Sequence, residues 1–119
     1  MKHNLANYIY RQTLESQGCS VNLDGSEPQS GYMVGLKGYE LKVNILDLQP
    51  EHLDHFIRKN GDQLFNRKYF IGTWIEGDTA YIDISINLKN KLVALAYGLF
   101  NGQICIWDVV RKLEIYQLS

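Results

Sequence analysis

The stretch from Thr79 to Leu88, TAYIDISINL, constrains the fold of this 119-residue chain more than any other. Its small or branched apolar side chains fall on alternate residues, Ala80, Ile82, Ile84 and Ile86. The residues between them are Tyr81, Asp83, Ser85 and Asn87. Successive side chains of a β-strand point to opposite faces, so this alternation predicts a strand with one buried face. The rest of the chain has to supply a core for that face.

The flanking residues predict a hairpin followed by a crossover helix and a returning strand. A second β-rich run covers Tyr69 to Ile75, and Glu76-Gly77-Asp78 predicts a three-residue hairpin loop between the two runs. Asn90 is a suitable cap for a helix that Asn101-Gly102 ends. Its expected apolar stripe has the spacing i, i+3, i+4, i+7 and consists of Leu92, Leu95, Ala96 and Leu99.

Two further strands are predicted after this helix. They cover Gln103 to Val110 and Leu113 to Leu118, with a turn near Arg111-Lys112. We expect the core of the whole C-terminal unit to include Ile82, Ile84, Leu92, Leu95 and Ile104.

The first 65 residues predict two helices and three strands. A helix from Asn4 to Gln17 is ended by Gly18, and a short strand from Cys19 to Leu23 precedes a polar loop, Asp24 to Gly31. The remaining expected segments are strands at Gly31 to Leu36 and Tyr39 to Leu46 that form a hairpin at Lys37-Gly38, a helix from Pro50 that buries Leu53, Phe56 and Ile57, and a short turn at Asp62 to Phe65 that buries Leu64 and Phe65.

These segments together predict one α+β domain over residues 1–119. We expect a mixed or mostly antiparallel sheet of about five to seven strands, with two to three helices gathered on one face. The helix that follows the hairpin should form a right-handed crossover between two strands of the sheet.

The composition excludes several classes of protein. With 45% hydrophobic residues and a net charge of −1, the chain is neither disordered nor rich in the basic residues by which nucleic-acid binders neutralise phosphates. No run approaches 18 apolar residues, so we expect no membrane contact. The first ten residues lack a signal-peptide core, and the two cysteines form no disulfide framework or CxxC pair. The sequence therefore predicts a cytoplasmic protein.

Few residues have the pattern of a catalytic or metal site. Asp83 and Asp108 lie in apolar strands, where carboxylates can act as acid and base, although Asp108 could simply hold the turn that follows it. His52 and His55 could share a metal or lie on a solvent-exposed helix face; with no third ligand in sequence we favour the exposed face. No nucleophile motif is present. We expect no cofactor and no metal.

Aromatic residues are the main candidates for binding. Eight tyrosines and two tryptophans exceed the needs of a small core, and exposed Trp and Tyr are the usual anchors of protein interfaces. Tyr81 could meet either of two sets of residues on the neighbouring strand, and a helix could also cover that face. The predicted binding residues are Trp74, Tyr81, Asp83, Trp107, Asp108 and Tyr32.

The C-terminal half resembles a family of small proteins carried by phages, prophages and conjugative elements. The shared pattern, G-x-W…Y-[IVL]-D-x-S…Q-x-A-I-[FWY]-D with a short alanine-containing helix before the glutamine, falls here on Gly72, Trp74, Tyr81, Asp83, Ser85, Ala94, Gln103, Ile106, Trp107 and Asp108. Cys105 stands where the pattern has alanine, and the pattern continues to Glu114 and Ile115. The resemblance also includes Ser30 to Glu40, and it implies a shared fold and a mobile-element setting, but no activity.

Three functions are consistent with these features. The favoured one is a small non-enzymatic binding protein of phage or mobile-element type that acts stoichiometrically on a macromolecular partner, for example as an inhibitor or modulator of a host defence nuclease. We expect this partner to be a protein rather than a nucleic acid. A second is an enzyme that acts on a nucleotide or nucleic acid through Asp83 and Asp108. The third is a structural or assembly component that self-associates, so a homo-oligomer is a further expectation.

Overall fold

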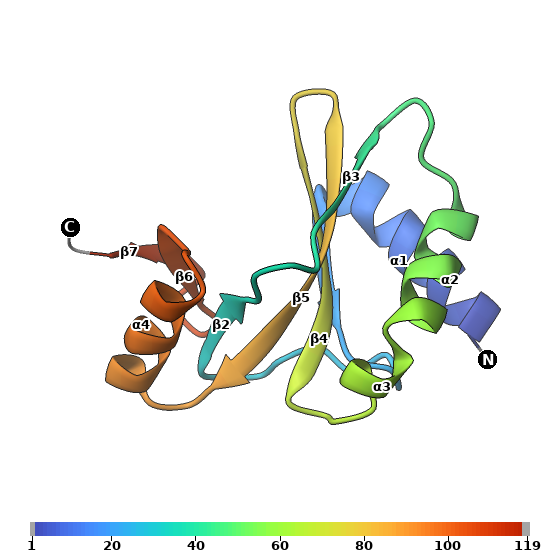
Figure 1. Ribbon diagram of the computed structural model, residues 1–119. Coiled ribbons are helices and arrows are strands. Elements are labelled where there is room, and N and C mark those ends of the chain that lie inside the picture. The colour runs from blue at the N-terminus through green and yellow to red at the C-terminus, as the bar shows by residue number, and fades with distance from the viewer. Residues whose placement is uncertain (1, 118–119) are drawn as a thin grey trace.

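The structure, a computed structural model, describes residues 2–117 as four helices and one seven-stranded sheet (Figure 1). The helices are α1 (Lys2–Ser16), α2 (Pro50–Lys59), α3 (Gly61–Leu64) and α4 (Lys91–Phe100). The strands are β1 (Gly18–Val21), β2 (Tyr32–Gly35), β3 (Leu41–Asn44), β4 (Tyr69–Glu76), β5 (Thr79–Leu88), β6 (Cys105–Asp108) and β7 (Leu113–Tyr116). The predicted α+β class is confirmed, and the short helix α3 is the turn expected near Asp62.

The sheet is antiparallel throughout and has the strand order β1-β4-β5-β2-β6-β7, with β3 also paired to β5. Both β5 and β6 run antiparallel to β2, which lies between them, so β5 and β6 are parallel to each other. Helix α4 connects these two strands and is therefore the predicted crossover.

The prediction that β2 and β3 form a hairpin is wrong. Val34 of β2 pairs with Ile86, whereas Leu41 of β3 pairs with Ile82, so the two strands lie one after the other along the same edge of β5. Gly38, with φ of 94°, lies in the interruption between them. Two β-rich runs around a glycine turn are typical of a hairpin, but the ten-residue strand β5 offers an edge long enough for both.

All four helices pack on the face of the sheet that carries Ala80, Ile82, Ile84 and Ile86. The larger core cluster joins α1, α2 and α3 to β1, β4 and β5, and its buried residues are Ala6, Ile9, Val21, Leu48, Leu53, Phe56, Ile57, Leu64, Ile71, Ala80, Ile82 and Ile84. The smaller cluster lies under α4 and consists of Val34, Ile86, Ala94 and Ile106. Strand β5 contributes to both clusters, which places α4 in one lobe and α1–α3 in the other (Figure 1).

Helix α4 is rotated relative to the predicted stripe. Its buried residues are Ala94 and Gly98, while Leu92, Ala96 and Leu99 are exposed. A Cβ atom at Gly98 would lie 3.1 Å from Cγ2 of Ile106, so the helix lies too close to the sheet for a larger residue there. Ile104, also predicted to be core, is 75% exposed. The periodicity of apolar residues does not identify the buried side of α4, because the helix carries apolar residues on almost every side.

Smaller differences concern turns and ends. Gln17, with φ of 68°, takes the left-handed conformation that was expected of Gly18. The β4–β5 hairpin loop has two residues, Gly77 and Asp78, instead of three. Phe65 is exposed, although Leu64 is buried as predicted. The expected strand end at Leu118 lies outside the described residues. Between residues 2 and 117, no helix is long and apolar enough to cross a membrane.

Candidate functional site: the open face of the sheet

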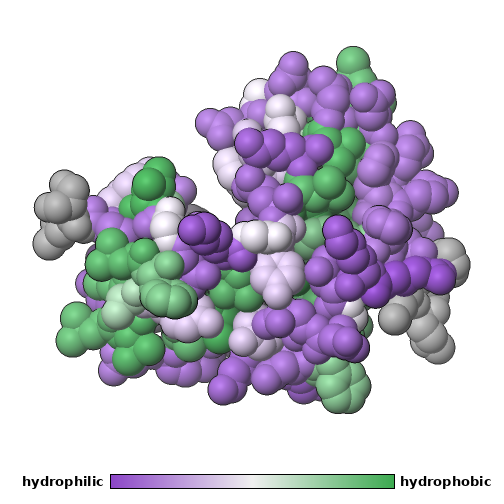
Figure 2. Space-filling view, viewed as in Figure 1, coloured by the Kyte–Doolittle hydropathy of each residue, from purple (hydrophilic) through white to green (hydrophobic). Residues whose placement is uncertain are grey.

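The face of the sheet opposite the helices is the first candidate site. The alternation of β5 places Tyr81, Asp83 and Ser85 on this face, and all four helices of the described chain pack on the other face. We call it the open face. Figure 2 shows the molecule hollowed between the lobe that carries α4 and the lobe that carries the β4–β5 hairpin.

An aromatic pair lies on the open face near the hairpin tip. Trp74 and Tyr81 are directly opposite each other on β4 and β5, and their rings stack with centroids 4.2 Å apart at an interplanar angle of 11°. Lys42 of β3 is the next residue across the sheet, and its Nζ lies 5.8 Å from the Tyr81 ring centroid. Trp74 is 40% exposed, so one large aromatic surface remains accessible to a partner.

Asp83 lies beside this pair, two residues further along β5. It is opposite Gly72, and its Oδ1 is 2.6 Å from the position that a Cβ atom on Gly72 would occupy. The Asp83 carboxyl group therefore occupies space that a side chain at residue 72 would fill. Burial, together with the negative charge of Glu40, raises the pKa of Asp83 to about 6.

The two aspartates proposed as an acid–base pair lie on opposite faces of the sheet. Asp108 is buried on the helix-bearing face, and its Oδ1 accepts a hydrogen bond from the backbone N–H of Arg111 at 3.0 Å. This contact holds the β6–β7 turn, as the sequence allowed. The sheet therefore separates the Asp83 carboxyl group from that of Asp108.

The six predicted binding residues are only partly brought together. Trp74, Tyr81 and Asp83 form one group. Tyr32 packs against the smaller core cluster, on the same face as Asp108. Trp107 is 41% exposed on the open face, but it pairs with Met33, which in turn pairs with Asn87. Strand spacings put it roughly 20 Å from the Trp74–Tyr81 pair.

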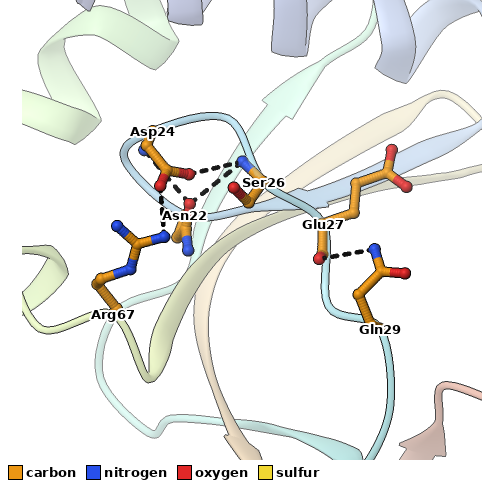
Figure 3. Close-up of polar contacts among 6 residues, drawn as sticks. All are labelled: Asn22, Asp24, Ser26, Glu27, Gln29 and Arg67. Carbon is orange, nitrogen blue, oxygen red and sulfur yellow. Dashed lines mark hydrogen bonds and ion pairs between the residues drawn. The ribbon is translucent and has the colours of Figure 1, made fainter.

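The polar loop between β1 and β2 is ordered by its own side chains (Figure 3). The backbone N–H of Ser26 donates to Oδ1 of Asp24 at 2.9 Å and to Oδ1 of Asn22 at 3.2 Å, and Arg67 forms an ion pair with Asp24. These contacts hold the pKa of Asp24 below its usual value. The loop borders an open cavity of about 590 Å³ lined by Glu27, Pro28, Gln29, Asn66, Arg67, Lys68, Phe70, Asn87, Leu88 and Lys89.

Of the two histidines of α2, His52 has a structural role at the helix start, and His55 is exposed. Nδ1 of His52 accepts a hydrogen bond from the backbone N–H of Gln49 at 3.0 Å, which caps the helix. Both cysteines are free, and burial raises the pKa of the Cys19 thiol to about 11. Residues 2–117 contain no group of three or more His, Cys, Asp or Glu side chains that could hold a metal ion.

A second surface, which the sequence pattern did not predict, lies on α4. Its large apolar side chains point to solvent, and Figure 2 shows them as a green area over α4. We define the α4 patch as Leu92, Val93, Leu99, Phe100 and Ile104. The small residues Ala94 and Gly98, four apart, could have identified the buried side of the helix, because close packing against a sheet favours them.

Comparisons with known proteins add no further constraint. A scan against models of protein families, a search of curated proteins and a search of solved structures each found no match. The resemblance to mobile-element proteins therefore stays a prediction, and function has to be argued from the geometry of the two surfaces.

Proposed function

We propose that this chain is a stoichiometric binding protein that holds a protein partner on its open face, around Trp74, Tyr81 and Asp83. One observation carries the proposal: a stacked aromatic pair with an exposed Trp74 and a half-buried Tyr81 lies on a sheet face that no helix of the described chain covers. Trp and Tyr dominate the binding energy of protein interfaces, because they contribute a large contact area at a small entropic cost.

The charges around the pair favour a protein over a nucleic acid. Glu40 and Asp83 flank the aromatic pair on one side, and Glu76 lies at the end of β4 on the other. Lys42 is the cation next to Tyr81, and its Nζ lies 4.0 Å from a carboxylate oxygen of Glu40, which offsets its charge. Phosphate groups would meet this acidic surface unfavourably, whereas an arginine or lysine of a protein partner would be attracted to it.

The partner class follows from the predicted setting of the chain. If it belongs with the mobile-element proteins it resembles, a host defence nuclease is the first protein to test. Such enzymes carry basic surfaces for DNA, and a basic surface complements the acidic residues beside Trp74. The chain would then act by occupying the nuclease, without catalysis of its own.

The test is a titration of purified defence nucleases with the wild-type chain and two tryptophan variants. We expect Trp74→Ala to weaken binding about 30-fold or more, the effect of losing a central aromatic anchor. Trp107→Ala is the matched control, because Trp107 has the same exposure on the same face at the distant end. We expect it to change the dissociation constant less than about threefold.

Fluorescence gives a second readout of the same complex. A bound partner should shield Trp74 from acrylamide, so quenching should fall in the Trp107→Phe variant, where Trp74 is the remaining tryptophan. Equal affinity of the wild-type chain and the Trp74→Ala variant would contradict the proposal. Quenching of Trp74 fluorescence by single-stranded oligonucleotides would favour a nucleic-acid partner instead.

A further inference from the structure

We infer that two copies of this chain associate through their α4 patches, with the two α4 helices antiparallel about a two-fold axis near Ala96. This inference goes beyond the proposed function, because it concerns the helix-bearing side of the sheet and needs no other partner. It rests on the size of the patch, the order of side chains along α4 and the charges at the helix ends.

The α4 patch is at the upper end of the size range of the largest apolar patches on monomeric proteins, about 300–600 Å². Leu92 is 76% exposed and Phe100 is 85% exposed, and the other three residues are all more than half exposed. With about 200 Å² for a large apolar side chain, the five residues present on the order of 600 Å². Contiguous apolar patches of this size usually mark an interaction site.

The order of side chains along α4 makes the patch self-complementary. Ala96 is exposed in the middle of the helix, with Leu92 and Val93 one turn before it and Leu99 and Phe100 one turn after it. The order of large, small and large side chains is the same in both directions along the helix, so it matches a second copy that runs the opposite way. In an antiparallel pair the two Ala96 residues let the helices approach, and the large residues of each copy meet those of the other. A two-fold interface requires this self-complementarity.

The charges favour the antiparallel arrangement over the parallel one. Lys91 is the only charged residue of α4, in its first turn, and the last turn contains no basic residue. Antiparallel packing places each Lys91 beside the carbonyl end of the other copy's helix, where the helix dipole favours a cation. Parallel packing would place the two Lys91 side chains side by side, and they would repel each other.

The area is sufficient for a dimer, and the core beneath the patch is small. Two patches would bury about 1,200 Å² in total, the lower end of the range for specific interfaces. The cluster under α4 has only four buried residues, so a second copy would nearly enclose α4 in apolar contacts. A lipid surface fits less well, because membrane-binding helices carry several basic residues beside the apolar face and α4 carries one.

Light scattering coupled to size exclusion tests the inference across a hundredfold range of protein concentration. We expect the wild-type chain to approach twice its monomer mass of 13.7 kDa, and Ala96→Glu to remain a monomer. Val110→Glu is the matched control, because Val110 is an exposed apolar residue outside the patch; it should dimerise like the wild type. Circular dichroism of both variants verifies that they are folded.

Cross-linking tests the position of the axis. In a Cys19→Ser, Cys105→Ser background, Ala96→Cys should form a disulfide-linked dimer on oxidation with copper phenanthroline. Leu46 is also exposed but lies in the other lobe, so Leu46→Cys should remain monomeric. A wild-type chain that is monomeric at every concentration would overturn the inference, as would a dimer that survives Ala96→Glu. Sedimentation of a monomer with phosphatidylcholine–phosphatidylglycerol vesicles would assign the patch to a membrane and also overturn it.

Discussion

Asp83 is the residue whose chemistry is most changed by its surroundings. Its carboxyl group lies over Gly72 and near Glu40, in a sheet face that is only partly open to water. Both burial and the neighbouring negative charge disfavour the ionised form, and the pKa is about 6 instead of 3.8. At neutral pH the chain therefore carries an ionised carboxylate at some cost to stability, in the centre of the candidate site.

This cost predicts a pH-dependent effect of Asp83→Asn. Because the pKa of Asp83 is higher in the folded state, protonation of its carboxyl group stabilises the fold. This stabilisation is complete below about pH 3.8, the ordinary pKa of the group, and is lost as the pH rises through about 6. Asp83→Asn should therefore raise the free energy of unfolding at pH 7.5, by about 1–3 kcal/mol. At pH 4.5 the increase should be much smaller. Urea denaturation at the two pH values measures both differences.

Asp47→Asn provides the control for this prediction. Asp47 is exposed in the turn after β3, so the same chemical change there should alter stability little at either pH. If Asp83→Asn raised the free energy of unfolding equally at pH 4.5 and pH 7.5, the surroundings of Asp83 would not disfavour its ionised carboxylate.

At the level of residues, the sequence predicts on which face of the sheet a side chain lies, but it does not predict which side chains contact each other. The alternation of β5 places Tyr81 and Asp83 on the non-core face, as the sequence indicates. The stacking of Trp74 on Tyr81 depends on register, which the hairpin loop sets. A two-residue loop pairs Glu76 with Thr79, whereas the expected three-residue loop would have shifted every pair.

At the level of elements, a buried hydroxyl pair connects α1 to the sheet. Thr13 Oγ1 donates a hydrogen bond to the backbone carbonyl oxygen of Ile9 at 2.7 Å. The same oxygen is hydrogen-bonded to Oγ1 of Thr73, and since its hydrogen is already used, Thr73 is the donor. Both residues are buried, so this chain of hydrogen bonds fixes the position of α1 over β4.

Thr13→Val should destabilise the fold by about 1–2 kcal/mol, because the Thr73 hydroxyl loses its acceptor in a buried place. The double variant Thr13→Val, Thr73→Val should be more stable than the sum of the two single effects predicts, since no unpaired hydroxyl remains. Urea denaturation of the four proteins gives the coupling energy. Strictly additive effects would show that the two hydroxyl groups do not interact.

Elements with a clear polar face were predictable, and those without one were not. Helix α2 was correctly predicted because Leu53, Phe56 and Ile57 stand out from charged neighbours. Helix α4 has no such contrast, and its orientation is decided by the small residues Ala94 and Gly98. The pairing of β2 and β3 with β5 depends on residues 35 to 56 positions away, which local turn signals do not report.

At the level of the whole molecule, one sheet carries two cores of unequal size. The cluster under α1–α3 has twelve buried residues and the cluster under α4 has four. Since buried apolar area is the main source of stability, the lobe with α4, β6 and β7 should open more often than the lobe with α1–α3. Strand β5 joins the two and should be the last element to open.

Hydrogen exchange followed by mass spectrometry checks this expectation. Amides of β6, β7 and α4 should exchange faster than those of β4 and β5 at low protein concentration. If the chain dimerises through α4, protection of α4 should rise with concentration, while protection of β4 should change little. Uniform protection across the sheet would mean that the two cores unfold as one unit.

The sheet separates the two proposed surfaces, and this has a consequence for how strongly the protein could hold its target. The aromatic pair lies on one side and α4 on the other, so joining two copies through α4 leaves both aromatic pairs free. Such an assembly is bivalent. Against a target that is itself two-fold symmetric, the second contact forms within the first complex, and avidity can exceed the affinity of one site by about a hundredfold or more.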